Sequence, residues 1–136
     1  MGIVYTEITL KNSGDVMRAE DGDRKEEDIR QLTVRALVDT GAWTLVISED
    51  ISDKLGLRVR GAYRGRLANG VKAESKIAGP VEIWWKDRSA NCDVLVLPGA
   101  RNVLLGAIPM EAMDLIVNPK GEEVVGAHGD EIEIYI

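Results

Sequence analysis

The chain has 136 residues, of which 45% are hydrophobic and 29% charged, values typical of one compact soluble domain. Its formal net charge of −6 and its pI near 4.8 argue against nucleic-acid binding, which needs a basic face. No apolar run is long enough to cross a bilayer, and the first residues lack a signal pattern. We therefore expect a cytoplasmic protein with no nucleic-acid and no membrane partner. One local basic stretch, interpreted as a solvated strand face, consists of Arg58, Arg60, Arg64 and Arg66.

The apolar residues recur mainly with the two-residue period of strands. Strands are expected at residues 1–10, 32–38, 43–47, 81–85, 92–97, 102–105, 115–118 and 131–136, with a hairpin over 64–72 centred on Asn69-Gly70. A short helix is expected at Glu49–Leu55, capped by Ser48 and closed by Gly56, and another near Pro109–Met113. This composition predicts a single all-β domain over 1–136, built as a closed or partly closed barrel.

Residues 11–30 are polar and dense in charge. We interpret them as a long, mobile hairpin connection, too hydrophilic to bury anything. At the other end, Ile132, Ile134 and Ile136 alternate along a strand that needs a buried face. That strand either joins an intersubunit sheet or closes the barrel within one chain.

One pattern occurs twice. An apolar strand ends at a glycine turn and a short helix follows, first from Ala36–Gly41 to Leu55 and again from Val103–Gly106 to Met113. If the two units face each other, both turns lie at the centre of the domain.

Asp39 is the main candidate for chemistry. It directly follows the apolar residues Ala36–Val38, and a carboxylate at the end of a buried strand is costly unless it is used or paired. Thr40 adds a hydroxyl, and Gly41 permits a tight turn. A plain turn with an Asx-type hydrogen bond explains the same three residues, and Asp-Thr-Gly alone is a weak motif.

Cys92 and His128 are the single cysteine and the single histidine. One cysteine allows no intrachain disulfide, and the two residues fall short of a zinc ligand set, so we expect neither a metal nor a cofactor. A thiol protease built on this pair is a further alternative. Nothing in the sequence brings the two together, and a cysteine in a strand is a small buried hydrophobe by default.

Four segments resemble the retropepsin-like aspartic proteases, and they occur in that family's order between about residues 32 and 118. ALVDTGA resembles the active-site loop, SEDISDKLGL the short helix of cellular members, RLANGV the flap hairpin and VLLG the second signature. These segments are Ala36–Ala42, Ser48–Leu57, Arg66–Val71 and Val103–Gly106. The resemblance implies the acid-protease barrel.

It also implies a homodimeric endopeptidase that hydrolyses peptide or protein substrates. Two copies of Asp39, one from each subunit, would share a proton and activate a water molecule. Thr40 would hydrogen-bond across the dimer, while Gly41 and Ala42 would line the substrate cleft. Trp43, which directly follows this loop, is expected to fill or shape a substrate pocket with its apolar indole. The remaining residues that the resemblance assigns are the flap residues Leu67, Ala68, Asn69 and Gly70, which grip substrate, and the second-signature residues Leu104, Leu105 and Gly106.

Two positions depart from the viral members of that family. Trp43 stands where many of them carry a second carboxylate, and Ala107 stands where they often carry an arginine. A second interpretation is kept because catalysis depends on subunit pairing and flap closure: the fold could serve as a dimerisation or peptide-binding module without turnover.

Overall fold

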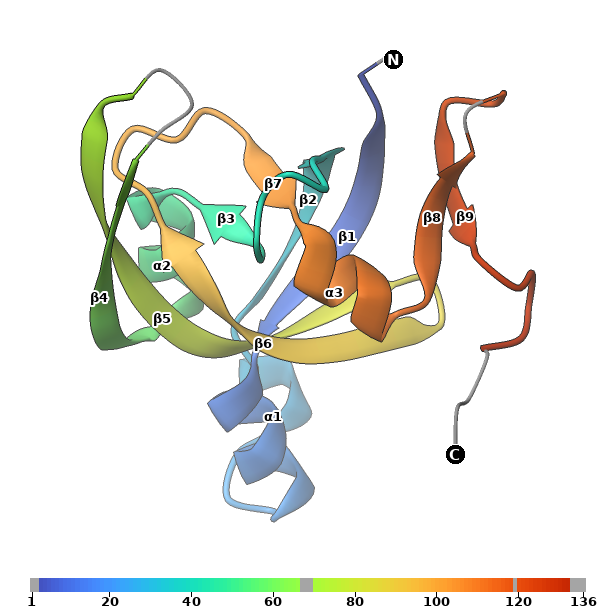
Figure 1. Ribbon diagram of the computed structural model, residues 1–136. Coiled ribbons are helices and arrows are strands. Elements are labelled where there is room, and N and C mark those ends of the chain that lie inside the picture. The colour runs from blue at the N-terminus through green and yellow to red at the C-terminus, as the bar shows by residue number, and fades with distance from the viewer. Residues whose placement is uncertain (1–2, 67–69, 119, 133–136) are drawn as a thin grey trace, which may run out of the picture.

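The computed structural model describes residues 3–66, 70–118 and 120–132. Six strands close into a barrel in the order β1, β2, β7, β3, β6, β5, because β1 pairs with β5 as well as with β2 (Figure 1). The strands are β1 (Tyr5–Asn12), β2 (Gln31–Val38), β3 (Val46–Ile47), β4 (Arg58–Arg66), β5 (Lys72–Trp85), β6 (Arg88–Val96), β7 (Val103–Leu105), β8 (Leu115–Asn118) and β9 (Glu123–Gly126). The helices are α1 (Ser13–Glu20), η1 (a 3-10 turn, Glu26–Asp28), α2 (Glu49–Leu55) and α3 (Ala107–Ala112). The predicted all-β barrel is confirmed.

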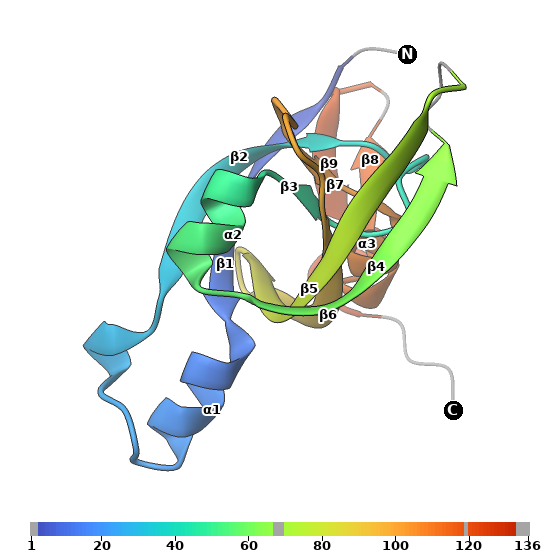
Figure 2. The same cartoon turned by 90° about the vertical axis from the view of Figure 1, so that its left-hand side faces the viewer.

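The long strand β5 belongs to two parts of the structure. Its first half pairs with β4 in a hairpin that extends beyond the barrel, and Val81–Trp84 pair with β1 (Figure 2). Gly79 and Pro80 separate the halves, and the register with β6 shifts between Ala78 and Val81. The break has a local cause, since Gly79 has a φ of 137° and Pro80 has no N–H to donate to the ladder.

The barrel interior is apolar. Along β1, Ile8 and Leu10 are buried, with Val4 just before them, as the alternation predicts. The other strands contribute in the same way, and α2 and α3 add Leu55 and Met110 to this core. Further fully buried side chains are Leu45, Ile47, Val81, Ile83, Val94, Leu105 and Met113.

The interpretation of residues 11–30 as a connection that buries nothing is wrong. The segment contains α1 and η1, and the side chain of Asp15 is fully buried. Asn12 caps α1 by accepting a hydrogen bond from the Asp15 N–H at 3.0 Å. The segment is ordered by polar contacts of this kind, because it has almost no apolar side chains to pack.

The other local predictions differ in outcome. Ser48 and Gly56 bound α2 as predicted, with Gly56 at a φ of 60°, and β8 spans the predicted residues. The strand expected at 43–47 is reduced to β3, Val46–Ile47. The hairpin of β4 and β5 is present and Arg66 pairs with Lys72, while the predicted Asn69-Gly70 turn lies partly outside the described residues.

Arg88, at the start of β6, holds the last described residues in place. Buried Arg88 donates to the carbonyl oxygens of Met113, Asp114, Gly129 and Glu131. This one guanidinium therefore joins α3, β8 and the residues after β9. Of the predicted terminal strand, residues 133–136 lie outside the described residues, and Ile132 is 48% exposed.

Candidate active site

The two strand–turn–helix units meet at the centre of the barrel. Strand β2 runs parallel to β7, pairing Ala36 with Val103 and Val38 with Leu105. The ladder continues into the first turn, where the Asp39 N–H donates to the Leu105 carbonyl at 3.0 Å. The expectation that the two units face each other and bring both turns to the centre of the domain is therefore confirmed.

Gly106 is required by this close approach. A Cβ atom at this position would lie 2.6 Å from the Ala42 carbonyl oxygen and even closer to that of Thr44. The next two N–H groups of this segment donate to the first loop, Ala107 to Ala42 at 2.9 Å and Ile108 to Trp43 at 3.1 Å. The second-signature residues thus hold the Asp39 loop from below, and Leu105 is fully buried beneath it.

Asp39 is half-buried at the end of β2. Its Oδ1 accepts a hydrogen bond from the Gly41 N–H at 3.0 Å, which is the Asx-type contact that a plain turn also makes. Among the hydrogen bonds of the described residues, none engages Oδ2 or the exposed Thr40 hydroxyl. One carboxylate oxygen is thus oriented by the loop, and the other is not held by any hydrogen bond among the described residues.

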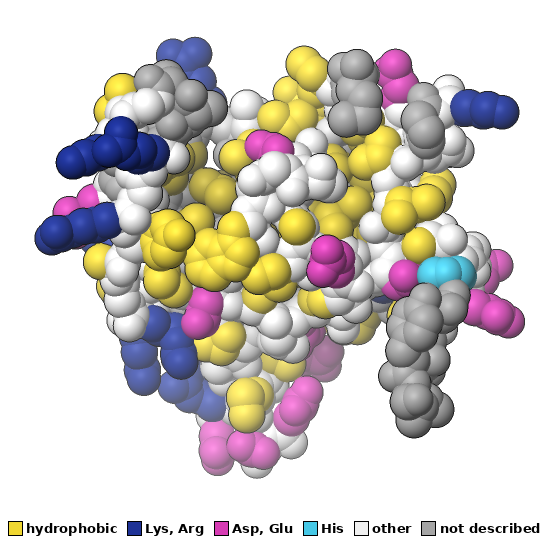
Figure 3. Space-filling view, in the orientation of Figure 1, with side chains coloured by type: hydrophobic (Ala, Val, Ile, Leu, Met, Phe, Trp, Pro, Cys, Tyr) yellow, Lys and Arg dark blue, Asp and Glu magenta, His cyan; other side chains and the backbone are white. Residues whose placement is uncertain are grey.

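An open pocket of about 340 Å³ lies over this loop. Its floor is the loop itself, through Asp39, Gly41, Ala42 and Trp43. The barrel contributes apolar side chains, and the β4–β5 hairpin covers one side. Figure 3 shows hydrophobic side chains gathered at this face, between the hairpin and α3. The residues from the barrel and the hairpin are Val46, Leu95, Leu97, Leu104, Tyr63, Gly65, Arg66 and Ser75.

Trp43 and Tyr63 join the loop to the hairpin. Their ring centroids are 5.6 Å apart with an interplanar angle of 32°, an arrangement favourable for aromatic pairs. Both side chains remain about half exposed, so they form an apolar wall that still faces solvent. Trp43 was predicted to shape a substrate pocket, whereas no sequence motif pointed to Tyr63.

The predicted flap tip is only partly described. Leu67, Ala68 and Asn69 lie outside the described residues. Gly70 is exposed with a φ of 82°, a left-handed conformation that glycine adopts without strain. The strands that lead to the tip, β4 and β5, project beyond the barrel above the pocket.

Cys92 and His128 are engaged with different partners. Thr44 donates to the Cys92 sulfur at 3.7 Å, and burial raises the pKa of this thiol. His128 instead contacts Asp114 at 2.7 Å, beside β8 and β9. A raised thiol pKa is unfavourable for a nucleophile, so this geometry speaks against the thiol-protease alternative.

A barrel of this topology, with an Asp-Thr-Gly loop held by a glycine turn from a second, parallel-paired segment, has the architecture of an aspartic protease. Comparison with known families agrees: a family model described as aspartyl protease matches residues 27–125. The chain therefore belongs to the aspartyl protease family. A search among curated proteins returned no match.

Two further features of the described residues are relevant to function. None of their helices is long and apolar enough to span a membrane. Across the same part of the chain, no three histidine, cysteine, aspartate or glutamate side chains lie together as a metal site would require.

Proposed function

We propose that the protein is an aspartic endopeptidase whose active unit is a homodimer. The observation that carries the proposal is the position of Asp39, the single acidic residue among the described residues that line the pocket. Aspartic protease chemistry needs two carboxylates that share a proton. The second strand–turn–helix unit of this chain offers Gly106 instead of an aspartate, so the second carboxylate must come from another copy.

The roles follow from the loop geometry. In the dimer, the ionised Asp39 takes a proton from the water between the two carboxylates, and the protonated Asp39 donates to the scissile carbonyl. The Gly41 N–H orients Oδ1 from within each subunit. The exposed Thr40 hydroxyl is available to bond across the interface.

The pocket indicates the kind of substrate. Its wall is apolar, built from Trp43, Tyr63 and leucine side chains of the barrel, which favours an extended peptide carrying a hydrophobic side chain. The β4–β5 hairpin would close over that peptide and exclude water.

The test compares wild type with Asp39→Asn, using Asp53→Asn on the surface of α2 as the matched control. Cleavage of a mixed peptide library should fall by several orders of magnitude in Asp39→Asn and remain unchanged in Asp53→Asn. Cleavage that persists in folded Asp39→Asn refutes the assignment, and a wild type that binds peptides without cleaving them favours the non-catalytic module.

A mixing experiment tests the dimer separately. If each active unit needs two copies of Asp39, adding an excess of Asp39→Asn subunits lowers wild-type activity through inactive heterodimers. Under the same conditions, an enzyme that acts as a monomer keeps its full activity. Sedimentation of the mixture checks that subunits associate and exchange.

A further inference from the structure

A second, smaller pocket lies away from the Asp39 loop, where α1, the end of α2 and the start of β4 come together. It has a volume of about 200 Å³. Four arginines line it, Arg18, Arg30, Arg58 and Arg60, and the rest of the lining is Asn12, three glycines and a proline. No acidic residue is among the lining residues, although the chain as a whole carries a formal net charge of −6.

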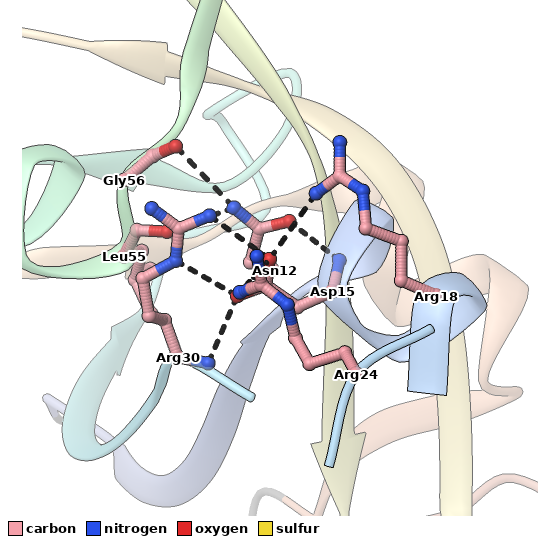
Figure 4. Close-up of polar contacts among 7 residues, drawn as sticks. All are labelled: Asn12, Asp15, Arg18, Arg24, Arg30, Leu55 and Gly56. Atoms are coloured by element: carbon pink, nitrogen blue, oxygen red, sulfur yellow. Dashed lines mark hydrogen bonds and ion pairs between the residues drawn. The ribbon is translucent and has the colours of Figure 1, made fainter. Parts of the chain in front are cut away.

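The arginines around this pocket outnumber the acidic side chains that pair with them. Arg18, Arg24 and Arg30 all approach one carboxylate, that of Asp15 (Figure 4). Arg60 pairs loosely with Asp93 at 3.4 Å. For Arg58, no acidic partner lies within the described part of the chain. Five guanidinium groups therefore face two carboxylates.

Asp15 also fixes the position of the Arg30 guanidinium. Arg30 donates to it through Nε at 2.8 Å and through Nη2 at 2.9 Å, and these contacts hold the pKa of Asp15 down at about 2. A guanidinium has five N–H donors, so Arg30 retains donors that Asp15 does not use. Its side chain is 42% exposed. The carboxylate thus holds the guanidinium in place and leaves part of it free.

Guanidinium groups that line one small pocket repel one another unless an anion lies between them. Arginine forks match the oxygens of a phosphoryl group, and the resulting charge-assisted hydrogen bonds are short and strong. Gly56 in the lining gives Arg30 its place, since a Cβ atom there would lie within 2.6 Å of the Arg30 guanidinium carbon. We propose that this pocket binds the phosphoryl group of a small soluble molecule, at a site separate from the Asp39 loop.

The test measures binding of inorganic pyrophosphate to the full chain by calorimetry, at matched ionic strength because surface charges are screened by salt. Arg58→Gln/Arg60→Gln removes two of the lining charges without touching the Asp15 contacts. Arg64→Gln is the control, since it removes an exposed arginine from the same strand outside this pocket. We expect binding to weaken roughly tenfold or more in the double variant, as lost charge-assisted hydrogen bonds predict, and to stay within about twofold in Arg64→Gln.

Three results would overturn the proposal: no binding by the wild type, an equal loss in Arg64→Gln, or unchanged binding in the double variant. Circular dichroism confirms that each variant is folded before it is titrated. A parallel arm uses vesicles that contain phosphatidate. Adsorption to these vesicles without binding of pyrophosphate would assign the arginines to a membrane surface and refute a small soluble ligand. Peptide cleavage is not a readout here, so the outcome is independent of the proposed protease activity.

Discussion

Replacing Asp15 with asparagine removes the one negative charge that three arginines share. The pKa of the Asp15 carboxyl is lowered from 3.8 to about 2, chiefly by the side-chain hydrogen bonds from Arg30. At about 1.36 kcal/mol per pKa unit, this corresponds to roughly 2.5 kcal/mol of stability. The arginine side chains are 28% to 49% exposed, and solvent screening reduces the expected loss to about 1–2 kcal/mol at pH 7.

The pH dependence provides a second readout. Because the carboxyl has the lower pKa in the folded state, its contribution is complete above about pH 5 and disappears as the pH falls through 3.8 toward 2. Asp15→Asn should therefore be less stable than wild type at pH 7, and the difference should shrink as the pH approaches 2. Urea unfolding at pH 7, 5 and 3 measures both effects. Protein concentration is held fixed, since dimer formation would make stability depend on it.

Asp23→Asn serves as the control, because Asp23 is an exposed residue of the same segment and donates to the Arg18 carbonyl oxygen through its backbone N–H. It should unfold like the wild type at every pH. The reasoning is refuted if Asp15→Asn is as stable as wild type at pH 7, or if the difference between them does not change with pH.

Two more predictions concern the centre of the barrel. Gly106→Ala places a Cβ atom against the Ala42 carbonyl oxygen and should cost about 3 kcal/mol in the free energy of unfolding. Gly61→Ala, which meets no atom within 4 Å, should change it by less than about 0.5 kcal/mol; similar losses in both variants would contradict the steric argument. The Cys92 thiol is partly buried, and burial raises its pKa. At pH 8 its rate of reaction with a thiol reagent should therefore be at least about tenfold lower in the folded protein than in urea. Equal rates would show that the thiol is accessible.

Elements whose ends are marked by residues close by in the sequence were predicted accurately. Helix α2 is bounded by a Ser48 hydroxyl and a left-handed Gly56, both of which act within one turn of the chain. The turns around Asp39 and Gly106 were likewise placed correctly, because each follows an apolar strand. Their direct contact depends on the parallel pairing of β2 with β7, which are far apart in the sequence. Only the repeated strand–turn–helix pattern indicated this contact in advance.

Features that depend on distant partners were missed. Helix α1 has no apolar stripe, and it is held by arginines that lie outside it, Arg24 and Arg30. Tyr63 contacts Trp43 only because the β4–β5 hairpin projects over the loop, a property of the whole sheet. The strand expected at 43–47 is shorter than predicted, because the carbonyls of Ala42 and Trp43 bond to the segment after Gly106.

The pairing of Ala36 with Val103 has a consequence for how the protein folds. About half of the chain lies between these residues, so the loop that must be closed to join them is one of the longest in the domain, and such contacts form slowly. The hairpins of β4, β5 and β6 connect neighbours in sequence and can form much earlier. A nascent or partly folded chain should therefore carry Asp39 on an unsupported turn, without the backbone of residues 105–108 beneath it. The proposed protease activity would then arise only in the last steps of folding, when the newly made chain itself no longer offers extended segments to cut.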